Sequence, residues 1–180
     1  MDTIILIIAI VVVAFVLFAF FWPDKVHVER ETIINAAPDA VFAHISDFNK
    51  WDAWSPWAKL DPNAKYTMTG SGVGQRMEWE SEKRDVGSGS QEIIVLDTPN
   101  KMVTKLDFGS MGGGMATFDV KPSGNGTKVV WALDTNMREG VPLHMKPMAT
   151  IFSFMMDGML GKQYEQGLAD LKTVVEAGHA

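Results

Sequence analysis

The sequence contains no cysteine among its 180 residues. This absence excludes disulfide bonds, thiolate metal ligands and a cysteine nucleophile. Positive charge is also scarce, because 16 Lys and Arg residues stand against 22 Asp and Glu residues and leave a formal net charge of −6. A nucleic-acid-binding protein needs a concentrated positive field, so the charge balance argues against a nucleic-acid partner.

Histidine is sparse as well, and its four copies do not cluster. His27, His44, His144 and His179 are scattered, and no two of them have the spacing of metal ligands along one helix. The glycine-rich stretch 70–74 joins two expected strands and has no helix or lysine after it, unlike a phosphate-binding loop. The sequence therefore predicts neither a metal site nor a bound cofactor.

Apolar residues, in contrast, are abundant and include one long run. Ile4 to Trp22 holds 19 consecutive apolar residues without charge, glycine or proline. As a helix it would extend roughly 28 Å, close to the ~30 Å hydrocarbon core of a bilayer. The run predicts a single-pass transmembrane anchor in residues 1–25, with residues 4–22 in the membrane. Lys25 and Arg30 follow the run, which favours a cytoplasmic position for the rest of the chain.

The alternative to an anchor is a cleaved secretory signal. It is disfavoured because no Lys or Arg precedes the apolar run and no small-residue cleavage site follows it.

Residues 26–180 read as one α+β domain. The alternating pattern of 26–35 predicts a strand, and Pro38 is suited to the first turn of a short helix. A second short helix or turn is expected to end at Pro56. The apolar spacing of 147–176 predicts a long terminal helix. Between them, six strands are expected at about Lys65–Gly70, Gln75–Glu80, Ser90–Asp97, Met102–Phe108, Met115–Lys121 and Lys128–Thr135.

The order of these elements predicts their arrangement. Short connections between successive strands favour an antiparallel meander, and with the first strand the sheet has about seven strands. The expected strands carry one apolar and one charged face, and the apolar face has to be covered. A curved sheet wrapped around the long terminal helix would bury the apolar surface of both.

Several local strings resemble those of a known superfamily. They are Ile34-Asn-Ala-Ala-Pro-Asp-Ala-Val-Phe42, Asp47-Phe-Asn-Lys-Trp-Asp-Ala-Trp-Ser-Pro56, Gly72-Val-Gly-Gln-Arg-Met-Glu-Trp79, Gly126-Thr-Lys-Val-Val-Trp131 and Gly167-Leu-Ala-Asp-Leu-Lys172. With them, residues 26–177 resemble the START-related, polyketide cyclase/dehydrase and pollen-allergen-like superfamily, SRPBCC, with its helix-grip fold. The superfamily includes lipid carriers, hormone binders, cyclases and co-chaperones, so the resemblance implies a fold without selecting one activity.

The expected inward face of the sheet and helix is rich in aromatic and methionine side chains. It holds almost no ionisable group, so the sequence offers no catalytic residue. Such a face either fills itself as a solid core or lines a cavity for a lipid-like or aromatic guest. The ligand-binding residues predicted on the second reading are Trp54, Trp79, Phe108, Phe118, Trp131, Phe152, Met155 and Met159.

Three functions remain open on the sequence. The leading one is a membrane-tethered module that binds a hydrophobic small molecule as a carrier, sensor or sequestering protein. The second is a cyclase- or hydrolase-like enzyme, for which Arg30, Glu92 and Asp97 are the charged residues to inspect. The third is a partner-binding module with a filled core, which would depend on Trp54 or Phe154.

Overall fold

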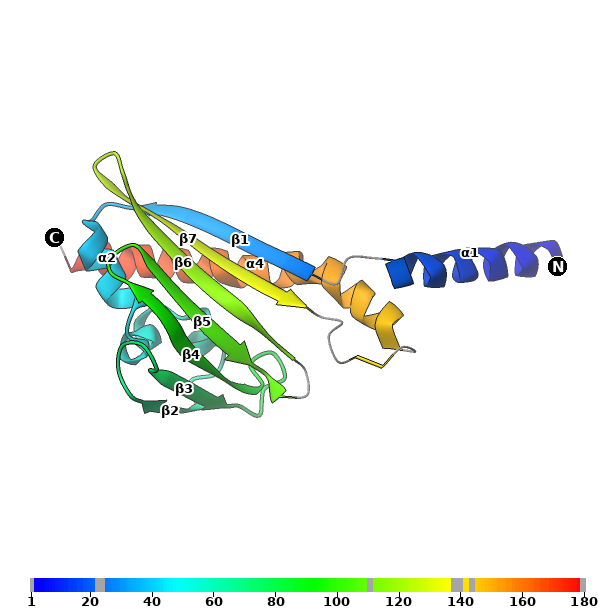
Figure 1. Ribbon diagram of the computed structural model, residues 1–180, viewed down its shortest axis with the longest axis horizontal. Helices are drawn as coiled ribbons and strands as arrows, with labels where there is room; N and C mark the ends of the chain where they lie inside the picture. Colours follow the sequence, from blue (N-terminus) through cyan, green and yellow to red (C-terminus); the bar gives the residue numbers. More distant parts are fainter. Residues whose placement is uncertain (1, 22–24, 110–111, 137–140, 143–144, 179–180) are drawn as a thin grey trace.

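The computed structural model describes residues 2–21, 25–109, 112–136, 141–142 and 145–178. Its described part has the predicted α+β order of one strand, short helices, six strands and a long helix (Figure 1). The elements are α1 (Asp2–Phe21), β1 (Lys25–Ile34), α2 (Pro38–Ile45), the 3-10 helix η1 (Phe48–Ala53), α3 (Pro56–Leu60), β2 (Lys65–Thr69), β3 (Arg76–Glu80), β4 (Ser88–Asp97), β5 (Lys101–Asp107), β6 (Gly113–Ser123), β7 (Gly126–Asn136) and α4 (Lys146–Ala177).

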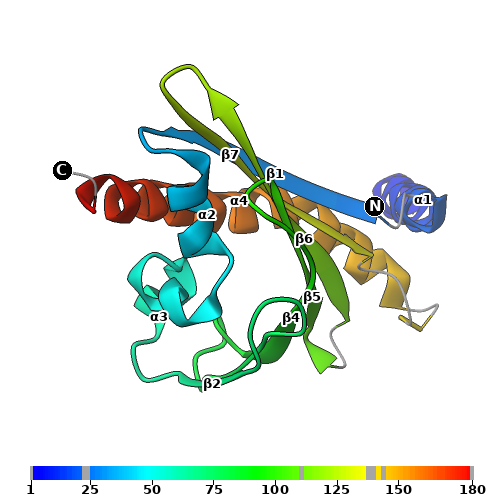
Figure 2. The ribbon, with the colours of Figure 1, turned by 60° about the vertical axis from the view of Figure 1, so that its left-hand side comes forward.

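The seven strands form one antiparallel sheet in the order β1-β7-β6-β5-β4-β3-β2. Strands β2 to β7 are a meander, as their short connections predict, and β1 returns to pair with β7. The turn between β6 and β7 contains Gly124 with a φ of 59°, a left-handed conformation that glycine adopts without strain. Strand β4 shifts register between Ile93 and Val95, and such a bulge bends a strand. The sheet curves around α4 (Figure 2).

Three short helices connect β1 to β2 and lie beside α4 on the concave side of the sheet (Figure 2). The Asp47 carboxylate caps η1 by accepting from the backbone N–H of Asn49 at 3.0 Å. Pro56 was expected to end a helical segment, and instead it begins α3. The physical reason is that proline has no N–H to lose in the first turn of a helix, and its fixed φ suits that position.

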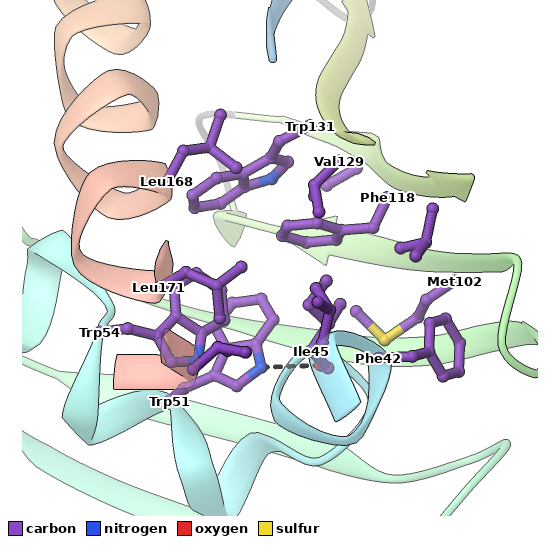
Figure 3. Packing of buried hydrophobic residues seen from close by; sticks show 14 of the residues in the cluster. Phe42, Ile45, Trp51, Trp54, Met102, Phe118, Val129, Trp131, Leu168 and Leu171 are labelled. Atoms are coloured by element: carbon purple, nitrogen blue, oxygen red, sulfur yellow. Dashed lines mark hydrogen bonds between the residues drawn. The ribbon is translucent and has the colours of Figure 1, made fainter. Parts of the chain in front are cut away.

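The alternation predicted for the strands is confirmed by burial. On β6, Ala116, Phe118 and Val120 are buried, and on β7 Val129 and Trp131 are buried. These inward side chains meet the buried residues of the short helices and of α4 in one hydrophobic core. In Figure 3, Trp131 and Phe118 of the sheet face Trp51 of η1 and Trp54, which lies at the C-terminal end of η1.

Apart from Thr150, the buried residues of helix α4 lie in its C-terminal part. Its inward positions Gly161, Tyr164, Leu168, Leu171 and Val175 follow the spacing of one helical face. Glycine is required where the helix comes closest to the sheet side. A Cβ at Gly167 would lie 2.8 Å from Trp131 Cζ3, and one at Gly161 would overlap the Arg30 guanidinium.

Helix α1 carries the long apolar run, and its described side chains are exposed. Among the residues that the structure describes, no helix is both long and apolar enough to cross a membrane. The predicted single-pass anchor at residues 4–22, and the membrane localisation built on it, are therefore wrong.

Candidate ligand-binding cavity

A cavity of about 200 Å³ lies between the inward face of the sheet and the helices that cover it. Its wall combines residues from η1, α3, six of the seven strands or their ends, and α4, so it is a product of the whole domain. The lining residues are Trp51, Ser55, Trp57, Tyr66, Met77, Trp79, Asp85, Val86, Gln91, Leu106, Phe108, Ala116, Trp131, Leu160 and Tyr164.

Stacked aromatic rings form one wall of the cavity. The Trp131 indole lies between Tyr164 and Phe118, with ring centroids 3.9 Å and 4.7 Å away and interplanar angles of 10° and 26°. Trp57 meets the edges of this stack, 5.8 Å from Trp131 and 6.3 Å from Tyr164. Stacked and edge-on contacts of this kind hold rings in defined orientations, so the aromatic wall is rigid.

Three of the predicted ligand-binding residues lie in the cavity wall. Trp79 and Phe108 pack edge to face with centroids 5.9 Å apart, and Trp131 belongs to the stack above. Two others lie behind the wall. Trp54 and Phe118 are fully buried in the solid part of the core and do not line the cavity (Figure 3).

The remaining three predicted residues lie away from the cavity. Phe152, Met155 and Met159 are 52%, 51% and 61% exposed on the N-terminal half of α4. The helical spacing of apolar residues predicted that these three side chains face the sheet, and that spacing does continue through α4. The inward positions of α4 are buried from Gly161 onward, whereas in the N-terminal half of the helix Thr150 is the buried residue and these three side chains are exposed.

The charged residues named for the enzyme hypothesis do not line the cavity either. Arg30 donates from Nε to Glu165 at 2.7 Å and from Nη1 to Asp157 at 2.9 Å, which joins β1 to α4. This guanidinium holds the pKa of the Asp157 carboxyl below its usual range. Glu92 lies 3.7 Å from Arg76 in a solvent-exposed ion pair, and Asp97 is exposed at the end of β4.

Both tyrosines of the sequence line the cavity, and both stay protonated. Burial raises the pKa of the Tyr164 hydroxyl above its ordinary value. Burial likewise raises the pKa of Tyr66, with a further contribution from the negative charges of Asp52 and Asp61. At neutral pH the cavity therefore presents neutral phenols, while the one acidic lining residue, Asp85, is exposed at its rim.

Two lining residues each carry a buried polar atom without a hydrogen-bond partner among the described residues. They are Trp131 Nε1 and the Tyr66 hydroxyl oxygen, and neither atom is accessible to water. The neighbouring indoles are satisfied by contrast. Trp51 Nε1 donates to the Ile45 carbonyl at 2.9 Å, and Trp79 Nε1 donates to the Val86 carbonyl at 3.3 Å.

The loop between β3 and β4 borders the cavity and is fastened to the end of α3. Ser81 donates its hydroxyl to the Asp61 carboxylate at 2.5 Å, and Lys83 Nζ donates to the Leu60 carbonyl at 2.7 Å. The Ser81 hydroxyl is the main cause that lowers the pKa of Asp61. The loop that carries Asp85 and Val86 is thereby held in place beside Trp57.

Sequence reasoning did not select several lining residues that the structure brings together. Tyr66 shares a strand face with Met68, so strand parity alone would have found it. Tyr164 lies four residues before Leu168 on the buried helical face, a spacing that would have found it as well. Leu160 lies four residues before Tyr164 and Gln91 shares a strand face with Ile93, so periodicity places both side chains inward without separating lining from core. Ser55 lies between η1 and α3, outside any periodic segment.

Metal binding finds no support in the described part of the chain. No group of three or more His, Asp or Glu side chains gathers there in a way that could hold a metal ion.

Comparison with solved structures identifies the fold as helix-grip. The di-domain aromatase/cyclase StfQ of the steffimycin biosynthetic pathway matches with a TM-score of 0.67 and 14% identity over 86% of this chain. This chain spans 52% of StfQ, about half its length. Ara h 8.0201 matches with a TM-score of 0.56 and 12% identity, covering 85% of this chain and 99% of its own. The protein of unknown function SA2116 from Staphylococcus aureus matches with a TM-score of 0.60 and 11% identity, covering 84% and 96%.

The family assignment follows from the sequence model that matches residues 25–176. The chain belongs to the family described as polyketide cyclase / dehydrase and lipid transport. This finding agrees with the superfamily resemblance of the sequence strings. No curated protein matches the chain.

Proposed function

We propose that this protein binds a small hydrophobic molecule with an aromatic or similarly flat shape in the cavity beside Trp131. The single observation that carries the proposal is the hollow of about 200 Å³ beside the hydrophobic core of the domain. Protein interiors leave few voids larger than a water molecule, so a cavity of this size is an exception that a bound guest would explain.

The size of the cavity limits the guest. An engineered cavity of roughly 150 Å³ binds benzene, while pockets for drug-sized ligands measure ~300–1,000 Å³. A cavity of about 200 Å³ suits a guest of one or two rings, or the end of a longer molecule that leaves through the rim at Asp85. The aromatic side chains of its lining, among them Trp57, Trp79 and Phe108, favour an aromatic guest.

Binding is a better description of this site than catalysis. The lining offers hydroxyl, amide and indole groups, and its one acidic side chain, Asp85, lies at the exposed rim. General acid–base catalysis requires a titratable group that reaches the reacting atom. A cyclase-like activity, as the name of StfQ describes for that protein, is therefore the second candidate. A filled partner-binding core, the third hypothesis from the sequence, is disfavoured by the cavity.

The test is a fluorescence titration of the full-length chain with N-phenyl-1-naphthylamine, whose two-ring naphthyl end suits the hollow while its phenyl ring extends through the rim. We expect saturable binding of one probe per chain, together with a blue shift of the probe emission. Ala116 lies in the cavity wall on β6, so Ala116→Met should fill the hollow and abolish that binding.

The matched control is Ala169→Met, which introduces the same side chain at an exposed position of α4. Apolar side chains exposed on α1 and α4 also attract the probe, so only the fluorescence that Ala116→Met removes and Ala169→Met retains reports the cavity. Equal binding by both variants and the parent protein would refute the proposal.

A further inference from the structure

We propose that a second copy of this chain packs against the N-terminal half of α4 and forms a symmetric dimer. The contact surface is a stripe of apolar side chains, which we call the α4 stripe. It consists of Met145, Met148, Phe152, Met155 and Met159. This surface is separate from the cavity, so the inference does not rest on the proposed function.

The first observation is that exposed apolar side chains are concentrated in this half of α4. The residues of the α4 stripe are 49–61% exposed, although α1 also contacts α4. Outside α1, seven of the twelve exposed large apolar residues in the described chain lie between positions 145 and 159. Figure 1 shows this part of the helix extending past the end of β7. A contiguous apolar surface of this kind is typical of an interaction site.

The second observation is the spacing of the α4 stripe. Its residues follow one another at steps of three, four, three and four residues. Two paired helices interdigitate along a seam with this repeat. At about 100° per residue, the stripe points away from Thr150, which is the buried residue of this half of the helix. The stripe therefore lies on the side of α4 that faces away from its own domain.

The size of the stripe suits a dimer. With side chains of ~200 Å² that are about half exposed, the five residues present on the order of 500 Å². Two such stripes together bury ~1,000 Å², which reaches the area that a specific protein interface requires. A single α4 stripe covered by its counterpart thus gives an interface at the lower end of the usual size.

The absence of free charge favours a second copy as the occupant. Asp157 is the only charged residue between positions 147 and 161, and it accepts from Arg30 Nη1 at 2.9 Å. A partner therefore meets methionine and phenylalanine without a charge to match, as in the core of protein interfaces. The stripe of another copy has this composition and the same spacing, and a two-fold axis brings the two stripes together.

The helix is already fixed before a partner arrives. Arg30 on β1 binds Asp157 and Glu165 of α4, and the inward positions from Gly161 onward are buried in the domain. Pairing of two preformed helices loses less conformational entropy than folding of a disordered segment on its partner. The domain thus presents the α4 stripe in a conformation that is ready to associate.

The experiment is sedimentation velocity of the full-length chain over a range of micromolar concentrations. We expect the parent protein to sediment as a dimer. Met155→Lys should raise the dissociation constant at least tenfold, because a symmetric interface would bury two ammonium groups without partners. The matched control is Met115→Lys, the same substitution at an exposed methionine of β6, and it should leave the dimer unchanged.

A second measurement places the contact on α4. The chain has no cysteine, so Phe152→Cys introduces a single thiol in the middle of the stripe. Bis-maleimidoethane should join two chains of this variant, and it should not join chains of Met115→Cys.

The outcomes distinguish the occupants of the stripe. A parent protein that is monomeric throughout the concentration range would overturn the inference. Association that persists in Met155→Lys and is lost in Val11→Lys would assign the contact to α1 and overturn it as well. If the monomer instead bound phosphatidylcholine vesicles and lost that binding in Met155→Lys, the occupant would be a lipid surface and the dimer would be wrong. The cavity proposal is independent, since Met155→Lys should retain the probe fluorescence that Ala116→Met removes.

Discussion

The two ends of the space between sheet and α4 are built from the same residue types and are filled differently. At one end, Trp54, Phe118 and Leu171 are fully buried in a solid core (Figure 3). At the other, Trp57 and Trp79 stand around a hollow of about 200 Å³. Aromatic composition therefore does not distinguish a core from a binding site. The difference is whether each ring is packed against other side chains or borders the hollow.

Hydrogen bonding does not follow this division. Trp54 of the solid end donates to the His44 carbonyl at 3.3 Å, and the lining residues Trp51 and Trp79 donate to the Ile45 and Val86 carbonyls at 2.9 Å and 3.3 Å. The Trp131 N–H, also on a lining residue, is buried and has no partner among the described residues. Paired indoles therefore occur at both ends, and the hollow distinguishes the two ends where hydrogen bonding does not.

The largest expected effect comes from truncating the solid end. Trp54→Ala removes a fully buried ring and an indole hydrogen bond, so it should lower the free energy of unfolding by about 3–5 kcal/mol. Urea denaturation followed by circular dichroism measures this loss. Trp57→Ala is the matched change at the hollow, where the ring is only partly buried, and should cost less stability while weakening N-phenyl-1-naphthylamine binding. Equal stability losses would remove the distinction between the two ends.

The next effect concerns the close approach of α4 to the cavity wall. A Cβ at Gly167 would lie 2.8 Å from Trp131 Cζ3 and 3.0 Å from Pro56 Cδ. Overpacking costs ~1–3 kcal/mol and the helix gains up to ~1 kcal/mol from alanine, so Gly167→Ala should destabilise by about 1–2 kcal/mol. Thermal or urea unfolding measures the change.

Gly158 offers the matched control for that substitution on the same helix. Nothing lies within 4 Å of a Cβ placed there, so Gly158→Ala should stabilise the protein by up to ~1 kcal/mol through helix propensity. Opposite signs for the two alanines are expected. The same sign would show that the short distance at Gly167 is relieved by a small movement of the helix.

A smaller effect is expected from acid at the solid end. The amide of Gln75 donates to Asp47 at 3.0 Å and is the main cause that lowers the pKa of this carboxyl. A carboxyl with a lowered folded pKa adds stability that is present above its unfolded value of ~3.9 and is lost as the pH falls through the folded value. Asp47→Asn should therefore make the loss of stability below about pH 4 shallower, as measured by urea midpoints across that range.

Gln75→Met tests the cause of this acid dependence. It removes the amide, so the same flattening should appear while Asp47 is still present. An unchanged acid profile in both variants would contradict the role of this pair.

The smallest effect is expected at the Arg30 contacts that join β1 to α4. Asp157 accepts from Arg30 at 2.9 Å but is largely exposed, and ion pairs in water contribute little because solvent and salt screen them. Asp157→Asn should leave ligand binding unchanged, with a small loss of stability that disappears in high salt. A loss as large as that of Gly167→Ala, measured in the same urea titration, would mean that Arg30 anchors the helix to β1.

Local sequence patterns predicted much of the fold and part of the cavity lining. Strand parity predicted the inward direction of Trp131 and Phe118, and the helical period predicted Leu168 and Leu171 as buried. The same period wrongly assigned Met159 to the sheet, because periodicity says which face of a helix is apolar and nothing about how far the sheet extends. The transmembrane anchor was a further expectation that failed.

Alternation in the strands, the turn glycines and the spacing along the last helix were sufficient to determine an antiparallel sheet around a long helix, since these are properties of neighbouring residues. Tertiary structure alone decided that Trp131 borders a hollow, while Phe118, its register partner on the neighbouring strand, is packed from behind. Whether a ring has a neighbour, and whether its N–H has an acceptor, depends on residues distant in sequence whose positions only the folded chain brings together.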